Sequence, residues 1–168
     1  MTREEQVQSN AMAILAVCKE IETITNTSDF AHILFGLAFC ESSGEWNRPM
    51  EELLRVEAAA SDTGVWQITP IYKRDVDFYL ANQSGWYAET FGDKKPDMDT
   101  LDGQSRYART YCHIYRRKLQ PDLSDFWLLH HYGPSMKNRA NNVDETNKYL
   151  TNYNKGLEVF NALNQVQG

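Results

Sequence analysis

The sequence predicts a mainly α-helical protein. Apolar residues recur at helical spacing in several segments, whereas no segment alternates apolar and polar residues over a useful length. The best candidate for a strand is the short segment VWQIT at 65–69. The 168 residues suffice for one hydrophobic core but not for two comfortable domains, so we expect a single domain over residues 1–168.

The first helix is expected at residues 6–24. Its apolar side chains form a broad stripe that would face the core, namely Val7, Met12, Ile14, Leu15, Val17, Cys18 and Ile21. A second helix should follow through the segment FAHILFGLAFC, because Thr27, Ser28 and Asp29 offer side chains that can cap its start.

Glu41 comes at the end of this second helix, on its apolar face. Leu34, Ala38 and Glu41 lie at positions i, i+4 and i+7, so Glu41 should point toward the core. The helix dipole at a C-terminus and an apolar setting both disfavour an ionised carboxylate, so both raise the pKa of Glu41. A carboxyl that stays protonated near neutral pH is suited to general-acid catalysis. The alternative is a helix-terminal glutamate turned to solvent.

Further along, irregular polar segments alternate with helical ones. The irregular segments are 42–63, with a short candidate helix at 51–60, then 81–103 and the Asn-rich 138–147. Helical spacing returns at 108–119 and again at 149–163. Between them, PDLSDFWLLHHYGP predicts a helix that begins at Asp122 or Ser124 and is stopped by Gly133 and Pro134.

Composition and charge argue against several classes of partner. The net charge of −6 disfavours nucleic-acid binding, which needs a basic surface. Only YRRKL at 115–119 is locally basic, and we interpret it as a solvated helix face. No apolar stretch reaches the roughly 18–20 residues that a membrane span needs. The N-terminus lacks the basic-then-apolar plan of a signal peptide, so we expect synthesis in a cytoplasm without a Sec signal.

Neither a disulfide framework nor a metal site is expected. Cys18, Cys40 and Cys112 are odd in number and lack the spacing of metal ligands, which predicts reduced and mostly buried thiols. The adjacent His130 and His131 would project about 100° apart on a helix, so they do not predict a shared ion. We expect no metal and no cofactor.

Four short motifs occur in a fixed order along the chain. They are ESSGEWN at 41–47, DTGVWQITP at 62–70, HHYGP at 130–134 and ETNKYL at 145–150. In order and spacing they resemble the soluble-type lytic transglycosylases and goose-type lysozymes of glycoside hydrolase family 23, over about residues 28–155, with the N-terminal helix before them. The family's second motif reads Gly-Leu-Met-Gln-Ile, so Val65 and Trp66 are departures, and HHYGP departs most, from Ala-Tyr-Asn-x-Gly.

The resemblance implies a lysozyme-like fold of two helical lobes with a substrate cleft. It also implies cleavage of the β-1,4 linkage between N-acetylmuramic acid and N-acetylglucosamine in peptidoglycan. Glu41 would act as acid and then as base. The expected outcome is that of a lytic transglycosylase, in which the sugar's own 6-hydroxyl attacks. If water attacks, the enzyme is a muramidase and Asp62 is the candidate second carboxylate, with Asp75 and Asp77 weaker candidates.

The resemblance further implies substrate contacts for six residues. They are Ser42, Trp66, Gln67, His130, Tyr132 and Tyr149. Each also has a structural interpretation, because Ser42 can cap the helix and Tyr149 lies in helical register with Tyr153. Trp46 and Trp127, like Trp66 and Tyr132, fit either stacking on a sugar or packing in the core.

Two kinds of function remain open. The first is a peptidoglycan-cleaving enzyme, such as a bacteriophage endolysin, a virion-associated enzyme or an enzyme delivered by a secretion machine to the cell wall. The second is a catalytically inactive lysozyme-like protein that serves as a structural or wall-binding part of a phage particle or secretion apparatus. The expected partners are peptidoglycan strands and a virion or secretion-machine protein. Cleavage of a chitin-type polymer would differ from the first only in its substrate.

Overall fold

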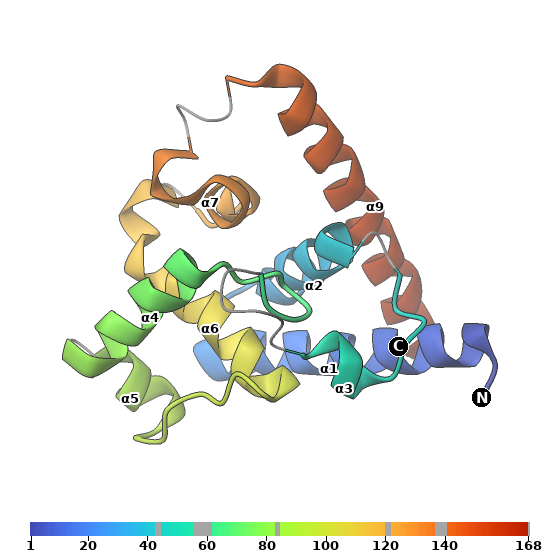
Figure 1. Cartoon of the computed structure of the whole chain (residues 1–168), viewed down its shortest axis with the longest axis horizontal. Helices are drawn as coiled ribbons and strands as arrows, with labels where there is room; N and C mark the ends of the chain where they lie inside the picture. Colours follow the sequence, from blue (N-terminus) through green and yellow to red (C-terminus); the bar gives the residue numbers. More distant parts are fainter. Residues whose placement is uncertain (43–44, 56–61, 83–84, 120–121, 137–140, 168) are drawn as a thin grey trace.

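The computed structural model describes residues 1–42, 45–55, 62–82, 85–119, 122–136 and 141–167, and it is mainly helical, as predicted (Figure 1). The α-helices are α1 (Arg3–Thr25), α2 (Phe30–Ser42), α3 (Met50–Leu53), α4 (Pro70–Asn82), α5 (Gly85–Phe91), α6 (Leu101–Ile114), α7 (Phe126–Tyr132) and α9 (Val143–Gln167). The 3-10 helices are η1 (Arg116–Leu119) and η2 (Gly133–Ser135). Within the described ranges, strand-type pairing is limited to an isolated bridge between Thr63 and Ile68.

Several predicted elements need correction. The predicted strand at 65–69 is wrong, because this segment is mostly a tight turn that the Thr63–Ile68 bridge closes. The segment 81–103 is not irregular throughout, since it contains α5. The candidate helix at 51–60 is reduced to α3, and residues 56–60 lie outside the described residues.

Helix α4 was not indicated by the sequence pattern. Its outward side carries Ile71 and Phe78, which are 63% and 66% exposed. Because apolar residues occupy both faces of α4, they do not recur on one side only, and the periodicity that predicts an amphipathic helix is lost.

Helix α1 begins with a capping box. The Thr2 hydroxyl accepts a hydrogen bond from the Glu5 amide, and the Glu5 carboxylate accepts one from the Thr2 amide. The buried face of α1 contains the apolar residues Ile14, Leu15, Cys18 and Ile21, each fully buried. All three cysteines are free and buried, as predicted. None of the described helices combines the length and the apolar character needed to cross a membrane.

Helix α2 lies between α1 and α9 and is the central helix of the fold (Figure 1). Gly36 of α2 faces Gly156 of α9. A Cβ atom built on Gly156 would lie 2.9 Å from the Cα atom and from the carbonyl oxygen of Gly36. The two backbones therefore touch, which only glycine permits here. This contact sets the position of α9 along α2.

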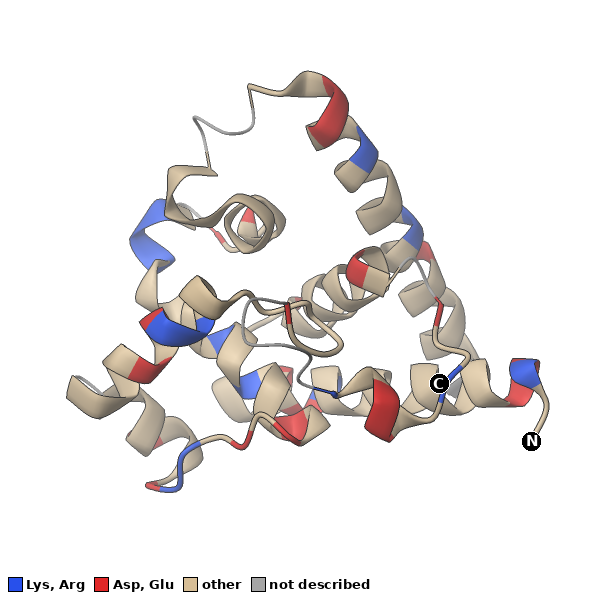
Figure 2. Cartoon of the chain, viewed as in Figure 1, with Lys and Arg blue, Asp and Glu red and all other residues tan. Residues whose placement is uncertain are grey.

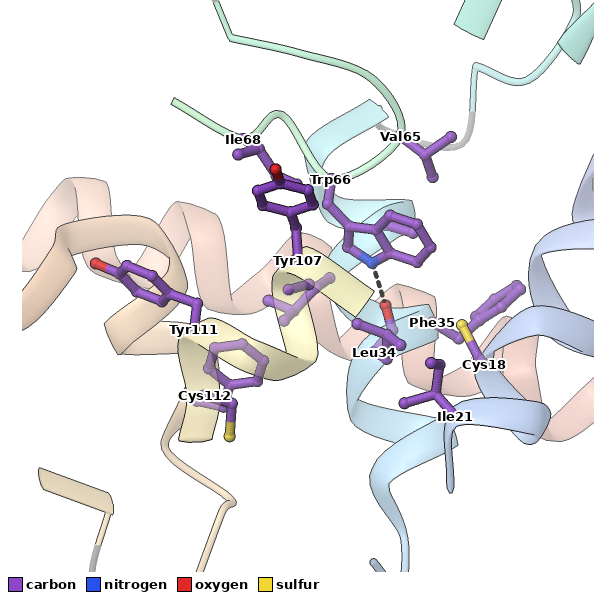
Figure 3. Packing of buried hydrophobic residues seen from close by; sticks show 14 of the residues in the cluster. Cys18, Ile21, Leu34, Phe35, Val65, Trp66, Ile68, Tyr107, Tyr111 and Cys112 are labelled. Atoms are coloured by element: carbon purple, nitrogen blue, oxygen red, sulfur yellow. Dashed lines mark hydrogen bonds between the residues drawn. The ribbon is translucent and has the colours of Figure 1, made fainter. Parts of the chain in front are cut away.

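The aromatic side chains join the remaining helices to this centre. Figure 3 shows Trp66 inserted beside α2, where its indole Nε1 donates a hydrogen bond to the Leu34 carbonyl oxygen at 2.9 Å. The rings of Tyr72 and Tyr111 stack with centroids 3.6 Å apart and link α4 to α6. The core thus reaches from α1 through α2 to the 63–68 turn and α6.

The close approach of α2 and α9 predicts that Gly156→Ala destabilises the protein. Replacing glycine by alanine inside an exposed helix stabilises it by about 1 kcal/mol. Here the added methyl would press on backbone atoms, and overpacking of this kind costs about 1–3 kcal/mol. We expect a net loss of about 1 kcal/mol in the free energy of unfolding, measured by urea denaturation. Gly85→Ala is the control, because a Cβ atom there meets no atom within 4 Å. Equal stability of the Gly156 variant and wild type would show that the helices do not touch.

Candidate functional site

Glu41 lies in the last turn of α2 and reaches the surface between two hollows. Its side chain is 17% exposed, while Leu34 and Ala38 on the same face are fully buried. The predicted orientation of this face is therefore confirmed. The carboxyl group is largely buried but remains open to molecules that enter either hollow.

The first hollow has a volume of about 470 Å³. It is lined by Glu41 and Ser42 of α2, by Glu45, Trp46, Asn47 and Arg48 of the loop after α2, by Leu53, and by Gly64, Val65 and Gln67 of the 63–68 turn. The second hollow, of about 190 Å³, is lined by Cys40, Glu41, His131, Glu145, Lys148, Tyr149 and Asn152. Glu41 thus contributes to both hollows.

Tyr149 of α9 is the hydrogen-bond donor to Glu41. Its hydroxyl donates to the Oε1 atom of Glu41 at 2.8 Å. Burial raises the pKa of Glu41 to about 7, against an opposing effect of the Tyr149 hydrogen bond and with a further increase from the negative charge of Asp62. Near neutral pH a large fraction of Glu41 therefore carries a proton.

His130 of α7 lies behind Glu41 as an uncharged side chain. Its Nε2 atom is 2.8 Å from the Trp66 carbonyl oxygen, which can only accept, so Nε2 carries the hydrogen. Its Nδ1 atom is 3.2 Å from the Tyr72 hydroxyl, which can donate to it. Burial lowers the pKa of His130 to about 4. The 3.6 Å between His130 Nε2 and Glu41 Oε1 is thus not an ion pair near neutral pH, and no cation there stabilises the ionised carboxylate.

The 63–68 turn forms one wall of the first hollow, and Gln104 of α6 holds it. The fully buried Gln104 accepts a hydrogen bond from the Val65 amide at 3.0 Å. Its Nε2 atom donates to the carbonyl oxygens of Leu54 and Met98 at 3.0 and 2.9 Å. Gly64 has φ +74°, and a Cβ atom there would lie 2.0 Å from the Gln104 Oε1 atom, so this position requires glycine.

Asn10 of α1 holds Trp46 and Arg48, which also line the first hollow. The side chain is 2% exposed, and its Nδ2 atom donates to the carbonyl oxygens of Trp46 and Arg48 at 2.9 and 2.6 Å. Trp46 and Arg48 are therefore tied to α1 through their backbone carbonyl groups. The residues that line the hollow are thus held by two buried amide side chains, Asn10 and Gln104, and the NH2 group of each donates two hydrogen bonds.

Three predicted residues lie at or near the first hollow. Ser42 lines it, although its hydroxyl donates back to the Ala38 carbonyl oxygen at 3.0 Å. Gln67 lines it from the turn, in a left-handed conformation with φ 49°. Asp62 is exposed and acts on Glu41 through its charge. The left-handed conformation of Gln67 is strained for a residue other than glycine, and such strain concentrates at functional sites.

The prediction that Trp66 stacks on a sugar is wrong. Its indole is 0% exposed and packs against α2. The predicted substrate contact of His130 is wrong for the same reason, because its side chain is only 1% exposed. Tyr132 is 8% exposed, its hydroxyl shares a hydrogen bond with Thr146 at 2.7 Å, and it lines neither hollow.

The neighbouring His131 reaches the second hollow. Its ring stacks on Tyr149 with centroids 4.0 Å apart, and its Nε2 atom lies 3.1 Å from the Glu145 carboxylate. Asp75 and Asp77 bond to tyrosine hydroxyls between α4 and α6 and line neither hollow. Across the described ranges, no group of three or more His, Cys, Asp or Glu side chains is arranged to hold a metal ion.

Comparison with known proteins assigns no chemistry to these residues. No protein-family model, no curated protein and no solved structure matches the chain. The chemistry of the site therefore follows from Glu41 and the groups around it, which suit the donation and return of a proton.

The raised pKa of Glu41 predicts how stability depends on pH. Because the folded protein holds this proton more tightly than the unfolded chain, stability falls as pH rises from about 4.5 to about 7. Buried His130 acts oppositely, since its lowered pKa removes stability as pH falls from 6.5 to about 4. Comparison with a neutral variant isolates Glu41.

We expect the free energy of unfolding of Glu41→Gln, relative to that of wild type, to increase by on the order of 3 kcal/mol as pH rises from 4 to 8. Urea denaturation at intervals of pH measures this difference. Glu20→Gln, an exposed position on α1, controls for the change in net charge. Parallel pH curves for wild type and Glu41→Gln would contradict the buried, protonated state of Glu41.

Proposed function

We propose that this protein is a peptidoglycan-cleaving glycosidase with Glu41 as its single catalytic acid and base. The observation that carries the proposal is the state of Glu41, a carboxyl group whose pKa burial raises to about 7 and which opens onto two hollows. A glycosidic oxygen is a poor leaving group until it is protonated, and a carboxylic acid of this kind supplies that proton.

The substrate we propose is the β-1,4 linkage between N-acetylmuramic acid and N-acetylglucosamine. Glu41 donates its proton to the glycosidic oxygen while the bond to the anomeric carbon breaks. The N-acetyl group stabilises the positive charge that develops on that carbon. The sugar's 6-hydroxyl then bonds to the carbon and returns its proton to the Glu41 carboxylate, so the product is a 1,6-anhydro sugar. The proton balance of Glu41 is restored in each cycle.

The proposed arrangement is lysozyme-like, with the glycan lying in a cleft between two helical lobes. Both walls of the first hollow support this, because Gln67 and the loop at 45–48 face the space beside Glu41. Tyr149 supports it as well, since its hydroxyl fixes the carboxyl group without supplying a charge. If water takes the place of the 6-hydroxyl, Asp62 is the nearby carboxylate that would assist it.

A second candidate function is that of a structural protein without catalysis. The observation in its favour is the burial of Trp66 and Tyr132, two side chains expected to contact the sugar. Under this proposal the protein is an inactive structural part of a phage particle or secretion apparatus. Under either proposal it works at the bacterial cell wall after release or delivery.

The decisive experiment compares the products that wild type and Glu41→Gln release from purified peptidoglycan. Mass spectrometry of the soluble fragments should show anhydro ends with wild type and a loss on the order of a thousandfold with Glu41→Gln. Glu20→Gln serves as the control for an equal change in charge. Reducing ends in place of anhydro ends would indicate a muramidase that uses Asp62. Binding of wild type to the wall without any release would refute the enzyme and favour the inactive protein.

Tyr149→Phe tests how the carboxyl group is held. Loss of the hydroxyl removes the hydrogen bond that lowers the pKa of Glu41, so the high-pH limb of the activity profile should move to higher pH. Looser positioning should also reduce the maximal rate by about tenfold. The control is Tyr153→Phe, one turn further along α9. A reduced rate with an unmoved pH limb would mean that Tyr149 contributes packing alone.

A further inference from the structure

The outward face of α4 carries apolar side chains in open solvent. Ile71, Arg74 and Phe78 follow one another at i, i+3 and i+7, so they share one side of the helix. Ile71 is 63% and Phe78 is 66% exposed, whereas Tyr72 and Val76 on the other side are buried. Two large apolar side chains are therefore exposed on one side of α4.

The basic segment RRKL lies beside this face. Arg116, Arg117 and Lys118 of η1 are exposed. The η1 segment follows α6, which is tied to α4 by a hydrogen bond from the Tyr115 hydroxyl to the Asp75 carboxylate at 2.8 Å. In Figure 2 the blue segments of η1 and of α4 lie on the same, left side of the view.

We call these six residues the α4–η1 patch: Ile71, Arg74, Phe78, Arg116, Arg117 and Lys118. A hollow of about 360 Å³ opens next to it, lined in part by Arg74, Phe78, Ile114 and Tyr115. The apolar stripe therefore continues into a recess between α4 and the end of α6.

The charge of the patch differs in sign from that of the protein. Its four cations are accompanied by the carboxylate of Asp75, while Lys73 and Asp77 neutralise each other at 2.6 Å. The whole chain carries a net charge of −6. The rest of the surface would be repelled by an anionic partner, so such a partner would be oriented toward this one face.

We propose that the α4–η1 patch binds the surface of an anionic lipid bilayer, with Phe78 and Ile71 entering the interface and the four cations contacting lipid phosphates. A soluble polyanion would satisfy the cations but would leave the two apolar side chains in water. A bilayer surface has anionic headgroups that can pair with the cations and, beneath them, acyl chains that can take up the two apolar side chains. The inference concerns a surface apart from Glu41 and does not rest on the proposed function.

Vesicle sedimentation tests the proposal with the full chain and no glycan present. Wild type should sediment with vesicles of equal parts phosphatidylglycerol and phosphatidylcholine, and much less with phosphatidylcholine alone. Salt at about 1 M, where the Debye length is about 3 Å, should weaken the binding strongly. This readout depends on no variant.

Matched variants assign the binding to the patch. Changing Arg117 and Lys118 together to Gln should weaken partition by roughly 30-fold, since each cation near the surface contributes about a factor of five. Phe78→Ser should weaken it by about tenfold or more through lost apolar contact. Lys94 and Lys95, exposed cations outside the patch, changed together to Gln are the control with the same charge change. We expect that control to stay within about threefold of wild type.

Three results would overturn the proposal. One is the absence of wild-type sedimentation with the anionic vesicles. Another is an equal loss of binding in the patch and control double variants, which would indicate a diffuse electrostatic effect. The third is a wild-type dimer that Phe78→Ser dissociates in the absence of lipid, because the patch would then be covered by a second copy of the chain.

Discussion

The contact of α2 with α9 at Gly36 and Gly156 is the constraint on which the candidate site depends. The backbones approach until a single added methyl would collide with the opposing main chain. Seven residues before Gly156 on α9, Tyr149 is thereby brought within hydrogen-bond distance of Glu41 at the end of α2. A wider separation of the two helices would leave a buried carboxyl group without its donor, and an unpaired buried polar group is unfavourable.

The walls of the first hollow are held by a second set of buried polar groups. Asn10 fixes Trp46 and Arg48, Gln104 fixes the 63–68 turn, and His130 ties the same turn to α7 through the Trp66 carbonyl oxygen. Each side chain is nearly inaccessible and bonded to backbone atoms from a different part of the chain. A site built in this way is ordered before a ligand arrives, so little conformational entropy remains to be lost on binding.

Periodicity along one helix was enough to predict the direction of Glu41, because its neighbours at i−3, i−4 and i−7 are apolar and local. The same reasoning failed for Trp66, whose burial depends on a carbonyl group 32 residues away. It also passed over Asn10 and Gln104, although each is a polar residue in an otherwise apolar stripe, which was the available signal. Most of their backbone partners, namely Trp46, Arg48, Val65 and Leu54, lie 36 to 50 residues away, so the pattern shows that such a residue is unusual but not what it binds.

Gln104 has a consequence for how any scan of mutations in this protein is interpreted. Its amide group accepts from one backbone amide and donates to two carbonyl groups, and no other side chain of its size does both. Glutamate could not donate to the two carbonyl groups, and leucine could make none of the three hydrogen bonds. Loss of function at position 104 would therefore look as severe as loss of a reacting group, although the residue is fully buried and lines neither hollow. Intolerance to substitution alone does not distinguish the residues that perform chemistry here from those that hold the walls in place.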